Sequence, residues 1–124
     1  MSTFGQYQTI PGLIATGDLS SHQYKLVKFA STANAVKIAT SSTSSVIGVL
    51  MNDPTDGQAA EVAFSGLVKV KASASVTLGQ FLMANSTGYV TDINTTGYTV
   101  GRALEASASA GYMINAILSF GPKK

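Results

Sequence analysis

The chain carries a weak internal repeat of glycines and short apolar runs, and this repeat restricts the folds open to it. Two glycine triplets are evenly spaced, nine residues apart in the first half and ten in the second: Gly48, Gly57 and Gly66, then Gly101, Gly111 and Gly121. Similar apolar runs surround the first glycine of each triplet, and similar hairpin-like segments precede them. We interpret this as two tandem pseudo-repeats, about 18–71 and 72–121.

Short apolar runs separated by Gly, Asn and Ser turns predict strands along most of the chain. We expect an all-β fold, a compact barrel or sandwich of about ten short strands. Gly66 separates two expected strands, 59–64 and 67–71. Residues 18–21 have the pattern of a short helical turn with Asp18 as its cap. Residues 103–110 have a helix-compatible composition, but the repeat alignment favours a turn there.

The first seventeen residues lack any sustained helix or strand period. We therefore expect an extended N-terminal arm, 1–17, followed by one β domain, 18–124. The arm either lies over the domain's own core or docks on a neighbouring molecule and becomes ordered on binding. Under the second interpretation, six residues would contact the capsid or a neighbour: Phe4, Tyr7, Ile10, Pro11, Leu13 and Ile14.

Charged residues make up only 11% of the chain, and its eight basic and six acidic residues give a net charge of +2. A polar surface with few charges suits close packing against copies of itself or a larger assembly, because little charge must be desolvated. It suits an ordinary soluble domain equally well. The basic residues do not form a dense stripe, so we expect no nucleic-acid partner.

The chain has no cysteine, which fits folding in a reducing cytoplasm. No apolar run approaches the ~18 residues of a membrane span, and the first residues lack the features of a secretory signal. We expect no membrane partner.

The sequence offers little for catalysis. His22, the sole histidine, has no recognisable nucleophile or acid beside it in the sequence. The six acids are dispersed, and a turn explains Asp53 and Asp56 without calcium. We expect no enzyme activity, no cofactor and no metal site. Most aromatic residues lie in expected strands and are expected in the core: Tyr24, Phe29, Phe64, Phe81, Tyr89, Tyr98, Tyr112 and Phe120.

The segments that carry the repeat also resemble a known family. They are DLSSHQY at 18–24, LVK at 26–28, IGVL at 47–50 followed by Asn52 and Pro54, AEVAFSG at 60–66 and VGRALEA at 100–106. Together these segments resemble the small capsid decoration, or cement, proteins of tailed bacteriophages. The resemblance runs from Asp18 to about Phe120.

This resemblance implies a non-enzymatic protein made in the host cytoplasm and bound to the outer capsid surface of the virion. Its implied partners are the major capsid protein and itself, as a homotrimer that bridges neighbouring capsid subunits and stabilises the shell. Two alternatives stay open. One is a carbohydrate-binding or host-adhesion module on the virion, in which Tyr89, Tyr98 and Tyr112 stack on sugars; the other is a structural protein of the tail or fibre.

Overall fold

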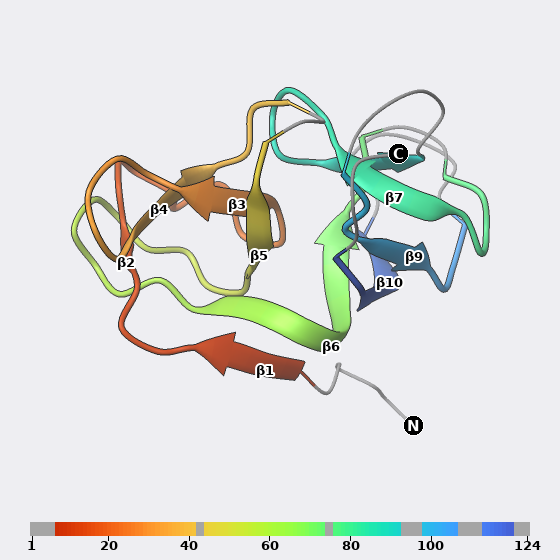
Figure 1. Cartoon of the computed structure of the whole chain (residues 1–124), viewed down its shortest axis with the longest axis horizontal. Coiled ribbons are helices and arrows are strands. Elements are labelled where there is room, and N and C mark those ends of the chain that lie inside the picture. The colour runs from red at the N-terminus through yellow and green to blue at the C-terminus, as the bar shows by residue number, and fades with distance from the viewer. Residues whose placement is uncertain (1–6, 42–43, 74–75, 93–97, 107–112, 121–124) are drawn as a thin grey trace.

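The computed structural model describes residues 7–41, 44–73, 76–92, 98–106 and 113–120 (Figure 1). Within these ranges the chain has ten strands and no helix, which confirms the predicted all-β class. The strands are β1 Tyr7–Ile10, β2 Ile14–Ala15, β3 Leu26–Phe29, β4 Ala35–Ile38, β5 Val46–Leu50, β6 Val62–Lys71, β7 Phe81–Ala84, β8 Val90–Asp92, β9 Gly101–Ala103 and β10 Met113–Leu118.

The strands form because small or apolar residues alternate with more polar ones at a period of two. In β10, for example, Ile114, Ala116 and Leu118 are buried, while Met113 and Asn115 are half-buried on the opposite side. β3 and β5 lack this alternation and have consecutive buried residues, because both of their faces are covered.

All ten strands belong to one sheet, in the order β2-β4-β3-β5-β6-β10-β9-β7-β8, and β1 pairs separately with β6. The two halves have the same strand order, because β4-β3-β5-β6 corresponds to β8-β7-β9-β10. They join where β6 and β10 pair antiparallel, with Val70 opposite Ile114 and Gly66 opposite Leu118.

Strand β6 runs through both halves and changes direction in its middle (Figure 1). The sequence predicted two strands separated by Gly66, and this was wrong. The ladder is continuous because β1 and β5 pair with the first part of β6 and β10 pairs from Gly66 onward. A bulge at Phe64 and a φ of 102° at Gly66 bend the strand without ending it.

Both ends of the sheet curl back toward the central strand, as in a barrel. Ile14 of β2 bridges to Ala59, and the amide of Ala60 donates to the carbonyl of Leu13 at 2.9 Å. At the other end Val90 of β8 bridges to Ala72, and its carbonyl accepts from the amide of Ser73 at 2.9 Å.

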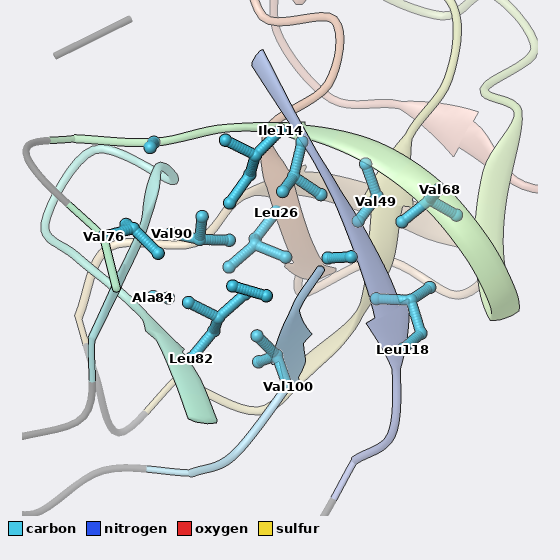
Figure 2. Close-up of a cluster of buried hydrophobic side chains, with 14 of the residues drawn as sticks. Leu26, Val49, Val68, Val76, Leu82, Ala84, Val90, Val100, Ile114 and Leu118 are labelled. Atoms are coloured by element: carbon cyan, nitrogen blue, oxygen red, sulfur yellow. The ribbon is translucent and has the colours of Figure 1, made fainter. Parts of the chain in front are cut away.

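Buried apolar side chains form two clusters. The larger core lies between the halves and inside the second one, and Figure 2 shows Leu26 and Val49 there beside residues of β6 to β10. The smaller core lies in the first half and includes Leu13, Val27 and Leu50. Consecutive residues of β3 and β5 therefore point into different cores, and this part of the sheet is a shared wall between them.

The first glycine of each predicted repeat lies where two strands approach closely. A Cβ on Gly48 of β5 would run into the carbonyl oxygen of Ala63 on β6. A Cβ on Gly101 of β9 would run into the carbonyl oxygen of Ile117 on β10. Only glycine fits at these two positions without displacing a neighbouring backbone.

Residues 18–22 form a turn and not a helical segment. The Asp18 carboxylate accepts a hydrogen bond from the Ser20 amide at 3.0 Å, and the His22 amide donates to the Leu19 carbonyl at 3.0 Å. The short side chain of Asp18 thus closes a local turn, as Asp often does outside helices. Residues 103–106 contain no helix, and residues 107–110 of the same segment lie outside the described residues.

Candidate binding surface

His22, the residue with most catalytic potential in the sequence, contacts a cation. Its Nδ1 lies 3.0 Å from Nζ of Lys25, which also stands 4.4 Å from the centre of the Tyr89 ring. Burial, and then the positive charges of Lys25 and Lys71, lower the pKa of His22, against an opposing effect of Asp18. The geometry favours a neutral imidazole that accepts a hydrogen bond from the ammonium.

The acidic residues that were considered for calcium, Asp53 and Asp56, lie in a loop that hydrogen bonds to neighbouring segments hold in place. The Asp56 carboxylate accepts a hydrogen bond from the Gly17 amide at 2.7 Å, and the side-chain oxygen of Asn52 accepts one from the Glu61 amide at 2.9 Å. Among the described residues, no three His, Cys, Asp or Glu side chains gather in a way that could hold a metal ion.

The most distinctive surface is the outer face of the sheet in the second half. We use the term outer face for the side chains of β6, β10, β9 and β7 that point away from the larger core. They are Leu67, Lys69, Lys71, Met113, Asn115, Ile117, Arg102, Phe81 and Met83. Their strand neighbours, such as Val68 and Leu82, are buried in the larger core.

A row of large side chains crosses this outer face from strand to strand. Leu67 lies opposite Ile117, Ile117 opposite Arg102, and Arg102 opposite Phe81. Ile117 and Phe81 keep 46% and 47% of their surface exposed, although residues of this kind are usually buried. Exposed apolar side chains that gather on one face of a sheet make that face a candidate for a protein–protein contact.

Arg102 is held in place at the centre of the row. Its Nε and one Nη donate to the carbonyl oxygen of Gly79 at 3.1 and 3.0 Å, and its guanidinium lies 4.8 Å from the centre of the Phe81 ring. A fixed arginine beside an aromatic ring loses little conformational entropy on binding, and both residue types are enriched at interface hot spots.

The outer face is positively charged. Arg102, Lys69 and Lys71 carry the positive charges. Glu105, at the border of the outer face, already accepts hydrogen bonds within the protein. Both carboxylate oxygens of Glu105 bind Asn115, one the side-chain amide at 2.9 Å and one the backbone amide at 3.3 Å. A partner that offers carboxylates around an apolar centre would complement this surface.

A second feature is a pocket of about 230 Å³ at the junction of the two halves. It lies where the start of β5, the segment before β9 and the segment after β10 meet. Its lining residues are Ser45, Val46, Tyr98, Thr99, Val100 and Phe120. The pocket is smaller than a typical small-molecule site, and the polar side chains that line it are the hydroxyls of Ser45, Tyr98 and Thr99.

The six N-terminal residues predicted to contact a neighbour occupy different environments. Phe4 lies outside the described residues. Leu13 is 5% exposed and packs in the smaller core. Tyr7 and Ile10 are half-buried against the larger and the smaller core, whereas Pro11 and Ile14 are exposed. Pro11 and Ile14 are thus the most accessible of the described five.

The sequence placed the phenylalanines in the core, and this was wrong for the four that the structure describes. Phe29, Phe64, Phe81 and Phe120 are between 38% and 55% exposed. The sequence held one usable signal, because polar Asn115 marks the outward side of β10 and period-two alternation then places Ile117 on the same side.

The three tyrosines proposed for sugar stacking do not form a described platform. One face of Tyr89 is covered by the Lys25 ammonium, Tyr98 lines the pocket, and Tyr112 lies outside the described residues. No helix in the described ranges is long and apolar enough to cross a membrane.

Comparisons with known proteins identify a family for this chain and a solved structure with a similar fold. A family model described as phage cement protein matches residues 13–118. The crystal structure of the head fiber gp8.5 N base in bacteriophage phi29 is similar, with a TM-score of 0.69 and 16% sequence identity over 94% of this chain and 95% of that chain. At this identity the likeness shows the fold alone. No protein in the curated set matches at a significant level.

Proposed function

The chain belongs to the phage cement protein family, and on that premise we propose that it binds the outer surface of a phage head and bridges neighbouring capsid subunits. Membership confirms the resemblance seen in the sequence and makes the protein a structural protein associated with the phage capsid. The bridging, the outer location, the major capsid protein as partner and the homotrimeric state are our proposal. We also propose that the protein catalyses no reaction.

The outer face carries this proposal. It joins two half-exposed large apolar side chains, Phe81 and Ile117, to an arginine fixed between them. Burying one such side chain contributes roughly 1.5–3 kcal/mol before the cost of ordering is subtracted. A few contacts of this size are sufficient on a capsid, because many linked copies raise the effective concentration of each further contact.

The remaining surface is compatible with attachment in many copies. The chain has only 11% charged residues, so neighbouring copies bring little charge into contact when they pack around a symmetry axis. The fold is shared with the base of a phage head fiber, and that likeness is compatible with a site on a head. The homotrimer is checked by native mass spectrometry of the purified protein.

Binding to phage heads that lack this protein tests the proposal. We expect the wild-type protein to co-sediment with such heads and to raise their resistance to heating. Phe81→Glu and Ile117→Glu should each weaken binding tenfold or more, because a carboxylate replaces a buried apolar contact and repels a carboxylate-bearing partner.

Phe29→Glu is the matched control. Phe29 is 55% exposed and lies on β3 in the other half of the molecule, so this variant should bind like the wild type. If the Phe29 variant lost binding and the other two bound normally, the capsid contact would lie on the first half of the molecule and not on the outer face. Failure of the wild-type protein to bind any head would overturn the proposed function itself.

A further inference from the structure

Within the described residues, one edge of strand β1 has no strand partner, whereas the terminal strands of the sheet are each bridged to another segment. In the described part of the chain, β2 is bridged to Ala59 and β8 to Ala72, so both ends of the sheet are at least partly covered. β1 pairs with β6 along one edge, and no described strand pairs with its other edge. The backbone N–H and C=O groups on that other edge are available to an additional strand.

Strand β1 lacks the residues that usually prevent another strand from pairing with an open edge. Natural edge strands are blunted by lysine, by proline or by inward charges. β1 contains none of these, and residues 7–17 include no charged residue at all. Gln8 and Thr9, in the middle of the strand, are also exposed.

We propose that the free edge of β1 accepts an extended segment of a capsid subunit by strand addition. This inference rests on the proposed capsid-binding function and deepens it. Main-chain hydrogen bonds along Tyr7–Ile10 hold the added segment. Because β1 has no charged residue to pair with a charge on the partner, we expect the centre of that segment to be uncharged.

The short length of β1 favours a capsid segment over a second copy of this chain. A stable interface between two proteins buries about 1,600 Å² in total, and two paired four-residue edges supply only a small part of that area. On a head, the same short edge adds to contacts made elsewhere on the protein. A few hydrogen bonds are then useful without being sufficient alone.

The edge is also continuous with the outer face. Gly66 of β6 pairs with Tyr7 of β1 on one side and with Leu118 of β10 on the other. The next residue, Leu67, begins the row of outer-face side chains. One partner surface can therefore reach the end of β1 and the start of the outer face together.

Amide hydrogen exchange of the wild-type protein, free and bound to heads that lack it, tests this inference. We expect exchange to slow at least tenfold on binding at those of residues 7–10 whose N–H groups point away from β6, because the others already face that strand. Residues 90–92 of β8 serve as the internal control, because the Ala72 bridge already covers that strand and their exchange should change little.

Each outcome separates the two proposals. Unchanged exchange in β1 while the protein stays bound would overturn the strand addition and leave the capsid-binding function standing. Slowed exchange that appears in the concentrated protein without heads would identify a second copy as the occupant and overturn the capsid segment. No binding at all would overturn the function on which the inference rests.

A pair of variants at one position gives a second test. Thr9→Pro removes a backbone N–H from β1, and Thr9→Val keeps it while removing the hydroxyl. We expect the valine variant to bind heads like the wild type and the proline variant to bind at least tenfold more weakly. Thermal unfolding of both variants shows whether proline also disturbs the pairing of β1 with β6. If it does, the exchange measurement on the wild-type protein decides whether a capsid segment pairs with β1. Equal binding by two folded variants would contradict the inference.

Discussion

At the scale of single residues, Gly48 and Gly101 have matching roles in the two halves. Each lies on a strand whose neighbour's carbonyl oxygen occupies the space of a Cβ. We expect Gly48→Ala and Gly101→Ala each to lower the free energy of unfolding by about 1–3 kcal/mol, because the paired strands must separate to fit a methyl group. Urea unfolding measures this, with Thr91→Ala on β8 as a control.

An alanine at either glycine that leaves stability unchanged would show that the strands shift freely at that point. Equal effects at both positions would match the equal geometry. A large effect at only one of them would mean that one half tolerates displacement better than the other.

His22 gives the protein a pH-dependent stability. Burial and the neighbouring Lys25 and Lys71 lower the pKa of His22 below its ordinary value of 6.5, so the unfolded chain takes up a proton before the folded one does. The resulting loss of stability begins as the pH falls through 6.5 and continues down to the lowered pKa.

We therefore expect His22→Gln, which cannot take up this proton, to lose less stability than the wild type between pH 7 and pH 5. Asp18 does not obscure this comparison. The Ser20 amide lowers the pKa of its carboxyl, so its contribution is lost only at pH values below 3.8. Equal slopes for the two proteins in urea unfolding from pH 7 to pH 5 would contradict the expectation.

At the scale of elements, β2 connects the N-terminal segment to the smaller core. Leu13 is 5% exposed just before this strand, whereas Ile14 within it is 40% exposed. We expect Leu13→Ala to cost about 2–5 kcal/mol of unfolding free energy and Ile14→Ala much less, because only the first leaves a cavity. Chemical unfolding of the two adjacent variants checks this directly, and similar losses would contradict the burial pattern.

Most of the strands could be predicted from the sequence, because apolar runs and polar turns alternate clearly from Leu26 to Leu118. The continuity of β6 could not, since Gly66 is an ordinary turn signal and only the pairing of β10 with it keeps the strand going. Local patterns indicate where a strand can form, whereas its length depends on which distant strands pair with it.

The candidate surface was harder to predict for a related reason. Phe81 and Ile117 lie in apolar runs that are typical of core strands. Polar Asn115 marks the outward side of β10 and so places Ile117, but no comparable signal marks Phe81. Their meeting with Arg102 depends on the register of three strands. The charge-poor composition suits close packing against an assembly and an ordinary soluble domain equally well, and only the folded sheet shows which side chains form the outer face.

At the scale of the whole molecule, the two halves share a wall and are expected to fold together. Leu26 and Val49 belong to the first half, yet their side chains pack in the larger core with residues of the second (Figure 2). A fragment of residues 1–73 would expose these side chains to water and would lose the pairing of β6 with β10.

We therefore expect fragment 1–73 to lack a cooperative unfolding transition and to give poorly dispersed amide resonances in NMR spectra. Addition of fragment 76–124 should restore dispersed resonances, because the two fragments together rebuild the larger core and the ladder between β6 and β10. The intact chain, for the same reason, should unfold in a single transition. A fragment 1–73 that folds cooperatively by itself would show that the smaller core is sufficient for the first half, and that each repeat is an independent unit.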